Sequence, residues 1–161
     1  MIDKLLIKHR SSIIDSWIRS IYSDYPPETS NFLNLQKNRF SNPVGYIIKD
    51  SAEKIYDELI GGNEIEKIKS YLEDIIKIKA VQDFTPSQAV GFVFSLKGAV
   101  YREIEQYLVI NEICEELIRF ESAVDQIALA AFDLYTASRE KIYNIRINEM
   151  RAQLFGKKEY R

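Results

Sequence analysis

The sequence predicts an all-α fold, a single helical bundle of about five or six helices, and three observations predict it. Large apolar residues recur every three or four positions over most of the chain, the period of a helix with one buried face. The chain has only 6 Gly and 4 Pro in 161 residues, too few for the frequent turns of a sheet protein. With 1 Cys and 1 His it has neither a disulfide framework nor a zinc site. This length suits one domain over residues 1–161 with its own core.

The first predicted helix spans about residues 3–23, where the apolar side chains form one broad face. Pro26 and Pro27 end it, because proline lacks the backbone N–H and disfavours helix in the residue before it. A short helix over about 28–37 is expected to follow.

The next helix is expected to begin at Asn42, an N-cap whose side chain accepts a backbone N–H, with Pro43 in the first helical position. Gly61 and Gly62 are predicted to end it in the left-handed αL conformation. Another helix then spans about 64–83. Its predicted inward-facing residues are Ile65, Ile68, Leu72, Ile75 and Ile76.

A capping box is predicted at Thr85 and Gln88, in which each side chain bonds the backbone N–H of the other residue. The helix that starts there, over about 86–108, is apolar on nearly all sides in its first half, so we expect it at the centre of the fold. Gly91 and Gly98 lie seven residues apart, hence on one face, and predict a close contact with another helix.

The last predicted helix, residues 112–155, is on the order of 60 Å long at the helical rise per residue. Its apolar residues alternate at four and three positions, the heptad spacing of a seam between helices. These seam residues are Ile113, Leu117, Phe120, Val124, Ile127, Ala131 and Leu134. Because the other predicted helices are much shorter, the end of this one should extend beyond them and pair with a second subunit. We therefore predict a homodimer, with 112–155 as its dimerisation and signalling helix.

Motifs that would carry catalysis or hold a cofactor are missing from the sequence. It contains no Gly-x-Ser-x-Gly nucleophile elbow and no Walker A loop, and 1 His cannot supply the two Glu-x-x-His motifs of a di-iron site. His9 borders the apolar face of the first helix and suits packing, and Cys114 suits an inert small hydrophobe. We expect no enzyme, and no catalytic residue, cofactor or metal site.

The charge is unevenly placed along a chain of net charge −2. Residues 139–161 hold 7 Lys and Arg against 3 Glu, which fits an interaction tail or, more simply, the C-terminal end of a helix dipole. A pI of 5.6 is low for a nucleic-acid binder, so no nucleic-acid partner is expected. Without a signal-peptide pattern or an apolar stretch long enough for a bilayer, the protein is predicted to be cytoplasmic with no membrane span.

Two segments go beyond generic helix chemistry, NRFSNPVG at 38–45 and KAVQDFTPSQAVGF at 79–92. Together with YPPET at 25–29 and FDLYTASREKIY at 132–143, they resemble the N-terminal domain of RsbR/RsbRD-type proteins. Those proteins are co-antagonists of the RsbT kinase in bacterial stress signalling. The resemblance covers almost the whole chain.

The resemblance implies a stressosome-like sensor domain that is helical, globin-related, without haem and dimeric, and whose last helix carries the signal. The chain ends after that helix, so we expect no STAS domain, which carries the phosphorylated output in the full-length regulators. Kinase-linked output through this polypeptide is therefore not expected.

Two functions remain open on these grounds. The leading hypothesis is a non-enzymatic sensory or regulatory module, dimeric, which passes the binding of an unidentified small molecule or a protein partner through its C-terminal helix. The alternative is an adaptor that assembles with a partner protein and binds no small molecule. If a pocket exists, its candidate residues are Trp17, Arg39, Tyr46, Asp83 and Gln88, polar-capable side chains near the motif segments. Helix capping by Asp83 and Gln88, and a brace at Arg39, are the competing explanations.

Overall fold

A computed structural model describes residues 1–62, 64–108 and 111–156. Within these ranges the chain forms seven α-helices, one short 3-10 helix and no strand, which confirms the predicted all-α fold. In chain order they are α1 Ile2–Lys8, α2 Arg10–Ser23, α3 Pro27–Leu35, α4 Pro43–Gly61, α5 Ile65–Val81, α6 Pro86–Ile104, η1 Glu105–Tyr107 and α7 Asn111–Gly156. No helix of the described chain is long and apolar enough to cross a membrane.

The predicted first helix is two helices, α1 and α2, and this break accounts for the seventh helix. His9 separates them with φ −97° and ψ 12°, outside the helical range. The buried Tyr56 hydroxyl of α4 donates to the Leu6 carbonyl at 3.1 Å, and in a continuous helix that carbonyl would bond the N–H of Arg10. A tertiary contact thus lies at the break, and sequence periodicity does not register it.

The predicted cap at the start of α4 is confirmed. Asn42 Oδ1 accepts the Gly45 N–H at 2.8 Å, and Asn42 Nδ2 donates to the carbonyls of Leu33 and Gln36. The buried Asn42 side chain therefore joins the end of α3 to the start of α4. At the other end, the prediction of an αL exit is wrong, because Gly62 has φ −125°.

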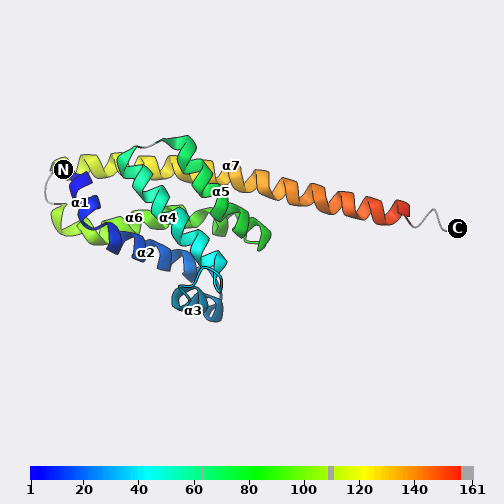
Figure 1. Cartoon of the computed structure of the whole chain (residues 1–161). Coiled ribbons are helices and arrows are strands. Elements are labelled where there is room, and N and C mark those ends of the chain that lie inside the picture. The colour runs from blue at the N-terminus through cyan, green and yellow to red at the C-terminus, as the bar shows by residue number, and fades with distance from the viewer. Residues whose placement is uncertain (63, 109–110, 157–161) are drawn as a thin grey trace.

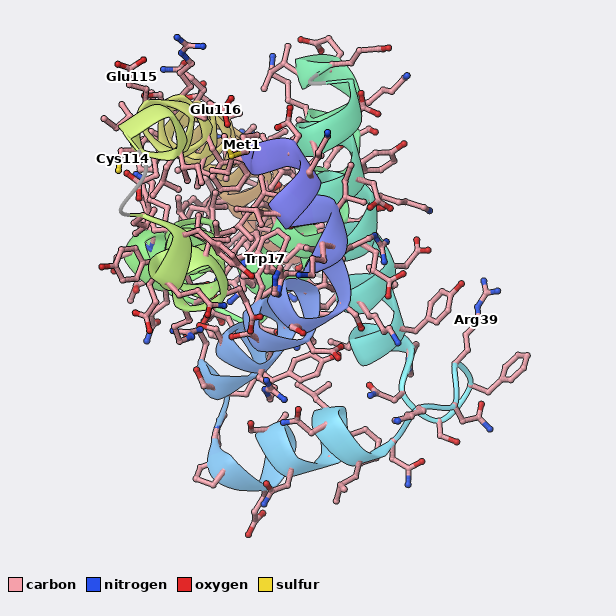
Figure 2. All side chains as sticks on the ribbon, turned by 90° about the vertical axis from the view of Figure 1, so that its left-hand side faces the viewer. Met1, Trp17, Arg39, Cys114, Glu115 and Glu116 are labelled. Atoms are coloured by element: carbon pink, nitrogen blue, oxygen red, sulfur yellow. The ribbon has the colours of Figure 1, made fainter. Side chains whose placement is uncertain are left out.

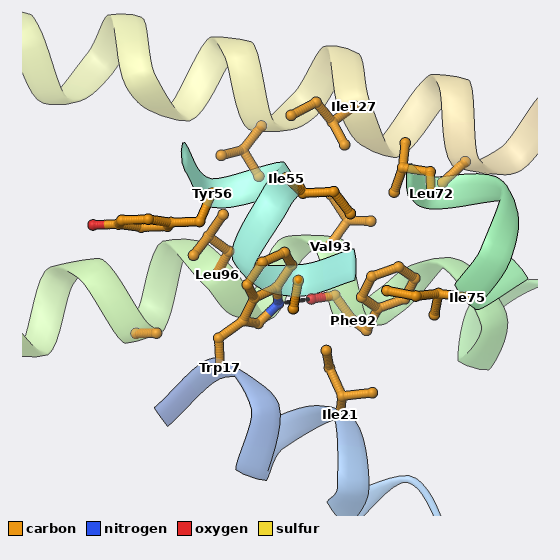
Figure 3. Close-up of a cluster of buried hydrophobic side chains, with 14 of the residues drawn as sticks. Trp17, Ile21, Ile55, Tyr56, Leu72, Ile75, Phe92, Val93, Leu96 and Ile127 are labelled. Carbon is orange, nitrogen blue, oxygen red and sulfur yellow. Dashed lines mark hydrogen bonds between the residues drawn. The ribbon is translucent and has the colours of Figure 1, made fainter. Parts of the chain in front are cut away.

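The central position of α6 is confirmed, since it packs between α2 on one side and α7 on the other, with α5 also in contact. Figure 3 shows Phe92, Val93 and Leu96 of α6 lying between Trp17 of α2 and Ile127 of α7. The Trp17 ring stacks on Phe92 at a centroid distance of 6.2 Å, and its indole N–H donates to the Phe92 carbonyl at 2.7 Å.

Two details of the predicted packing are wrong. A Cβ on Gly91 would meet nothing within 4 Å, and one on Gly98 would meet only the Arg102 guanidinium at 3.6 Å, so neither glycine marks a close helix contact. On α5, Ile65 is exposed, and it is the first residue of the helix. The other predicted inward residues, Ile68, Leu72, Ile75 and Ile76, are fully buried.

The long helix α7 has 46 residues, or about 70 Å at 1.5 Å per residue, and its presence confirms the prediction. Its first part packs on α5 and α6, whereas the residues from 143 to 156 are all exposed and extend well beyond the other helices (Figure 1). The basic residues Lys157, Lys158 and Arg161 of the predicted tail lie outside the described residues.

The seam predicted to join two subunits lies inside this chain. Its residues Ile113, Leu117, Phe120, Val124, Ile127 and Ala131 are buried and Leu134 is partly buried. They pack against the protein's own helices, so the prediction of a dimer seam at these residues is wrong. The heptad spacing has a simple cause: α7 lies along α5 and α6 and buries one stripe there, as it would against a second subunit.

Candidate functional site

A cluster of charged and aromatic side chains lies where α7 leaves the other helices. Its central group is the Lys79 ammonium, at the end of α5, with a side chain that is 0% exposed. Lys79 Nζ lies 2.9 Å from Asp24 Oδ2, at the end of α2, and 3.4 Å from the Gln88 carbonyl in α6. One buried cation of α5 thus contacts residues at the end of α2 and in α6.

Three aromatic rings surround the same ammonium. Its distances to the ring centroids are 4.6 Å for Phe84, 5.6 Å for Phe92 and 5.8 Å for Tyr25, within the range of cation–π attraction. Burial lowers the pKa of Lys79, while the hydrogen bond and the charge of Asp24 act in the opposite direction. The ion pair is asymmetric, since the Asp24 side chain is 33% exposed.

The turn between α5 and α6 is attached to α7 by Arg139. Asp83 in this turn adopts φ 57°, a left-handed conformation that non-glycine residues rarely adopt. Arg139 Nη1 donates to Asp83 Oδ1 at 2.6 Å and to the Ala80 carbonyl at 2.9 Å. The hydrogen bond from Arg139 lowers the pKa of Asp83, and the charge of Arg146, 3.9 Å away, adds to the effect.

A second bond from α7 reaches the same turn. The hydroxyl of Tyr135, a buried residue of α7, donates to the carbonyl of Phe84, whose ring lies over Lys79. Phe84 also meets Tyr25 edge to face, with centroids 5.2 Å apart. We call the group Lys79, Asp83, Phe84, Tyr135 and Arg139 the α7 junction, because these residues tie the helix to the rest of the molecule at its point of exit.

A surface cavity of about 400 Å³ opens beside the α7 junction. Its walls come from the residues that join α2 to α3, the first turn of α3, the turn before α6 and the first turn of α6: Asp24, Tyr25, Pro26, Thr29, Gln82, Asp83, Phe84 and Gln88. The Tyr25 hydroxyl donates to Gln82 Oε1 at 2.8 Å, and burial raises the pKa of Tyr25 to about 12. The predicted capping box is confirmed, and in it Gln88 Oε1 accepts a hydrogen bond from the Thr85 N–H at 3.0 Å.

The five predicted pocket residues do not form one site. Asp83 and Gln88 line the cavity at the α7 junction. Arg39 and Tyr46 pair elsewhere, with the guanidinium 4.8 Å from the ring centroid, on the loop before α4 and in its first turns. Trp17 lies in the core. Figure 2 shows the separation, with Trp17 in the interior and Arg39 at the far edge of the molecule.

Sequence reasoning missed Lys79, Tyr135 and Arg139. A signal for Lys79 exists: it follows Ile75 and Ile76 by four and three residues and therefore continues the buried stripe of α5. A lysine in that place is normally interpreted as the edge of a solvated face, and only the tertiary contacts show otherwise. For Arg139, nothing local indicates a bond to a turn more than fifty residues earlier.

The described residues do not place a catalytic constellation at the α7 junction. In that part of the chain no group of three His, Cys, Asp or Glu side chains could hold a metal ion. The single histidine and the single cysteine both contact other groups: His9 Nδ1 lies 3.2 Å from Glu103 Oε2, and Cys114 Sγ lies 3.1 Å from the Leu108 carbonyl.

Fold and site define a class of protein: an all-α domain whose long last helix is bonded to the rest of the domain through a cluster of charged and aromatic side chains. The chain belongs to the family described as the RsbT co-antagonist protein rsbRD N-terminal domain, whose model matches residues 11–150. The match confirms the predicted family, one of stress-signalling regulatory domains.

A relative is found in Archaeoglobus fulgidus. That protein, described as uncharacterized, is 24% identical over 152 residues, which cover 90% of this chain and 87% of the relative. No solved structure gives a significant match. A globin-related arrangement of the helices therefore stays a prediction.

Proposed function

We propose that this chain is a non-enzymatic sensory or regulatory module of the cytoplasm that acts as one domain and as a homodimer. It receives a ligand or a protein contact at the α7 junction and passes the signal through α7. The observation that carries this proposal is the attachment of the projecting helix by Arg139 and Tyr135 beside an open cavity. The family description names a co-antagonist of RsbT, which supports a protein partner in signalling.

For this function, α7 must be able to take two positions relative to the rest of the domain, which we call its two seatings. Arg139 and Tyr135 bond the turn whose residues Asp83 and Phe84 also line the cavity. A ligand in the cavity that bound better with this turn displaced would loosen α7, and one that bound better with the turn in place would hold it. A shift of this kind requires only that the ligand differ in affinity between the two seatings.

A homodimer is supported by a second apolar face on α7, opposite the buried seam. We call it the outer stripe; its residues are Leu129, Phe132, Tyr143, Ile147, Met150 and Leu154. Each is between 41% and 69% exposed, and the last four follow 4-3-4 spacing on the part of α7 that extends into solvent. A single projecting helix with such a face gains stability by pairing that face with a second copy.

Light scattering coupled to size exclusion tests the dimer. The wild-type chain should have twice the 18.8 kDa chain mass at micromolar concentration. Met150→Glu/Leu154→Glu, which places two charges on the outer stripe, should give the monomer mass. The matched control is Asn148→Glu/Ala152→Glu, with the same spacing on the same exposed segment but on the opposite side, and it should remain dimeric. A monomeric wild type, or a control as monomeric as the stripe variant, contradicts the proposal.

The adaptor is the second candidate, and the outer stripe favours it too, because an exposed apolar helix face also suits a partner protein. The two functions differ at the α7 junction. A sensor requires that changes at the junction alter the far end of α7, whereas an adaptor requires only that the stripe stay exposed. The distance between the two α7 helices of the dimer, measured with and without the Arg139 side chain, separates them.

A further inference from the structure

A second cavity lies between α2, α3 and α4, on a different side of the fold from the α7 junction. Its volume is about 320 Å³, the lower end of the range for small-molecule sites. Ile18 and Tyr22 of α2 and Leu33 of α3 line it, and all three are buried side chains. We call this cavity the basic pocket, for the charges at its rim.

Three cations from three elements converge on the basic pocket. Arg19 comes from α2, Lys37 from the loop after α3, and Lys49 from α4, whereas Asp15 is the one acidic residue in the lining. Within the described residues Arg19 and Lys37 form no ion pair, and Lys49 lies 3.9 Å from Glu53. In a chain whose net charge is −2, this concentration of positive charge around a hollow attracts an anion.

The inner wall of the basic pocket offers apolar contacts that a bare inorganic ion cannot use. Two polar groups of the lining already have partners: the Tyr22 hydroxyl donates to the Gly45 carbonyl at 3.1 Å, and the Asn42 amide donates to the Leu33 and Gln36 carbonyls. What Ile18 and Leu33 offer a ligand is apolar surface. Tyr46 also lines the cavity, and the guanidinium of Arg39, which Figure 2 labels on the loop before α4, lies 4.8 Å from the centroid of its ring.

We propose that the basic pocket binds a small organic anion with a carboxylate or phosphate group and an apolar body. The anionic group meets Arg19, Lys37 and Lys49, and the apolar body lies on Ile18 and Leu33. Charge and apolar surface are both needed, so the pocket discriminates against inorganic ions and against neutral aromatic molecules. The proposal uses neither the outer stripe nor the α7 junction, and it stands or falls separately from the dimer.

Titration of the full chain, followed by amide NMR shifts, tests this with four probes: phenyl phosphate, benzoate, inorganic phosphate and phenol. For probes of this size the expected dissociation constant is on the order of 1 mM. At least one of phenyl phosphate and benzoate should bind at that level, with saturable shifts confined to residues around the pocket. The tighter of the two identifies phosphate or carboxylate as the preferred group. Inorganic phosphate and phenol should each bind at least about tenfold more weakly, because each lacks half of the contact.

Arg19→Gln/Lys37→Gln/Lys49→Gln should weaken the better probe by at least about tenfold, since three charge contacts are lost. The matched control Lys4→Gln/Lys8→Gln/Arg119→Gln removes three exposed cations elsewhere and should retain the affinity. Arg19→Lys, which keeps the charge, should retain most of it. Unchanged amide spectra without ligand establish that each variant is folded. The proposal is overturned if neither organic anion binds, if inorganic phosphate binds as tightly as phenyl phosphate, or if the triple and control variants lose affinity equally.

Discussion

Among single residues, Lys79 has the most unusual position, a fully buried ammonium whose one anionic partner is partly in water. Desolvation of a buried charge is offset only when geometry and hydrogen bonds are good. Asp24, the Gln88 carbonyl and three aromatic faces supply that offset here. The same contacts join α2, α5 and α6 next to the turn that holds α7.

The burial of Lys79 predicts that removing Asp24 and removing Lys79 change the free energy of unfolding by different amounts. Asp24→Asn leaves the ammonium buried without an anion and should lower the free energy of unfolding by about 1–3 kcal/mol, less than for a fully buried pair because Asp24 is 33% exposed. Lys79→Met removes the buried charge, keeps most of the volume and should stay within about 1 kcal/mol of wild type. Urea unfolding monitored by circular dichroism measures both. Equal losses in the two variants would contradict this account, because a buried ammonium without an anion would then cost no more than its replacement by an apolar side chain.

The same residue predicts a pH dependence. The folded pKa of Lys79 lies below its ordinary value of 10.5, so between the two values the unfolded chain binds a proton that the folded chain does not. Stability contributed by Lys79 therefore rises with pH through this window. The melting temperature of wild type minus that of Lys79→Met should increase as pH approaches 10.5. Buried tyrosines such as Tyr25 are present in both proteins, so their effects on the pH dependence largely cancel in this difference. A difference in melting temperature that does not change with pH would contradict a lowered pKa of Lys79.

Caps could be predicted from sequence and the charged cluster could not, for a physical reason. Thr85 and Gln88 bond each other across three residues, and Asn42 accepts from Gly45, so both patterns are local. The carboxylate partners of Lys79 and Arg139, which are Asp24 and Asp83, lie more than fifty residues away in the sequence. Of the five predicted pocket residues, Asp83 and Gln88 line one cavity beside the Thr85 cap, and Arg39 and Tyr46 line another.

At the scale of elements, three glycines in helices predict opposite effects of one substitution. Gly91→Ala and Gly98→Ala should each raise the free energy of unfolding by about 0.5–1 kcal/mol, because α6 has room for the methyl group and alanine favours helix. Gly45→Ala should lower it, since a Cβ there would lie 2.2 Å from Nδ2 of the buried Asn42 cap. Thermal unfolding of the three variants measures the signs. Destabilisation by Gly91→Ala would indicate that this face of α6 is covered by a second chain.

Helix α7 shows where element-level prediction reached its limit. The existence and length of the helix followed from periodicity, but the 4-3 spacing of Ile113 to Leu134 has the same form whether its partner is this chain or another. The other helices had to be placed before the stripe could be assigned to the interior. Once the seam is assigned to the interior, the outer stripe is the apolar face of α7 that another chain could cover. The spacing of its residues is less regular along its first half.

At the scale of the whole molecule, a helical body and an exposed helix end meet at one charged junction (Figure 1). If the junction sets the seating of α7, a small change there is carried along a rigid helix to its far end. Two copies joined by the outer stripe would convert that change into a different separation or crossing of their helix ends. Sensor and adaptor then predict different responses to the loss of Arg139.

The decisive measurement is the distance between spin labels on the two α7 helices of the dimer. The label is placed at Asn148→Cys, away from the outer stripe, in a Cys114→Ala background. Arg139→Gln breaks the bonds to Asp83 and Ala80 and should shift or broaden the distance distribution, while Lys141→Gln, its neighbour without such bonds among the described residues, should leave it unchanged. Identical distributions for wild type and Arg139→Gln would contradict signal transfer through α7 and leave the adaptor.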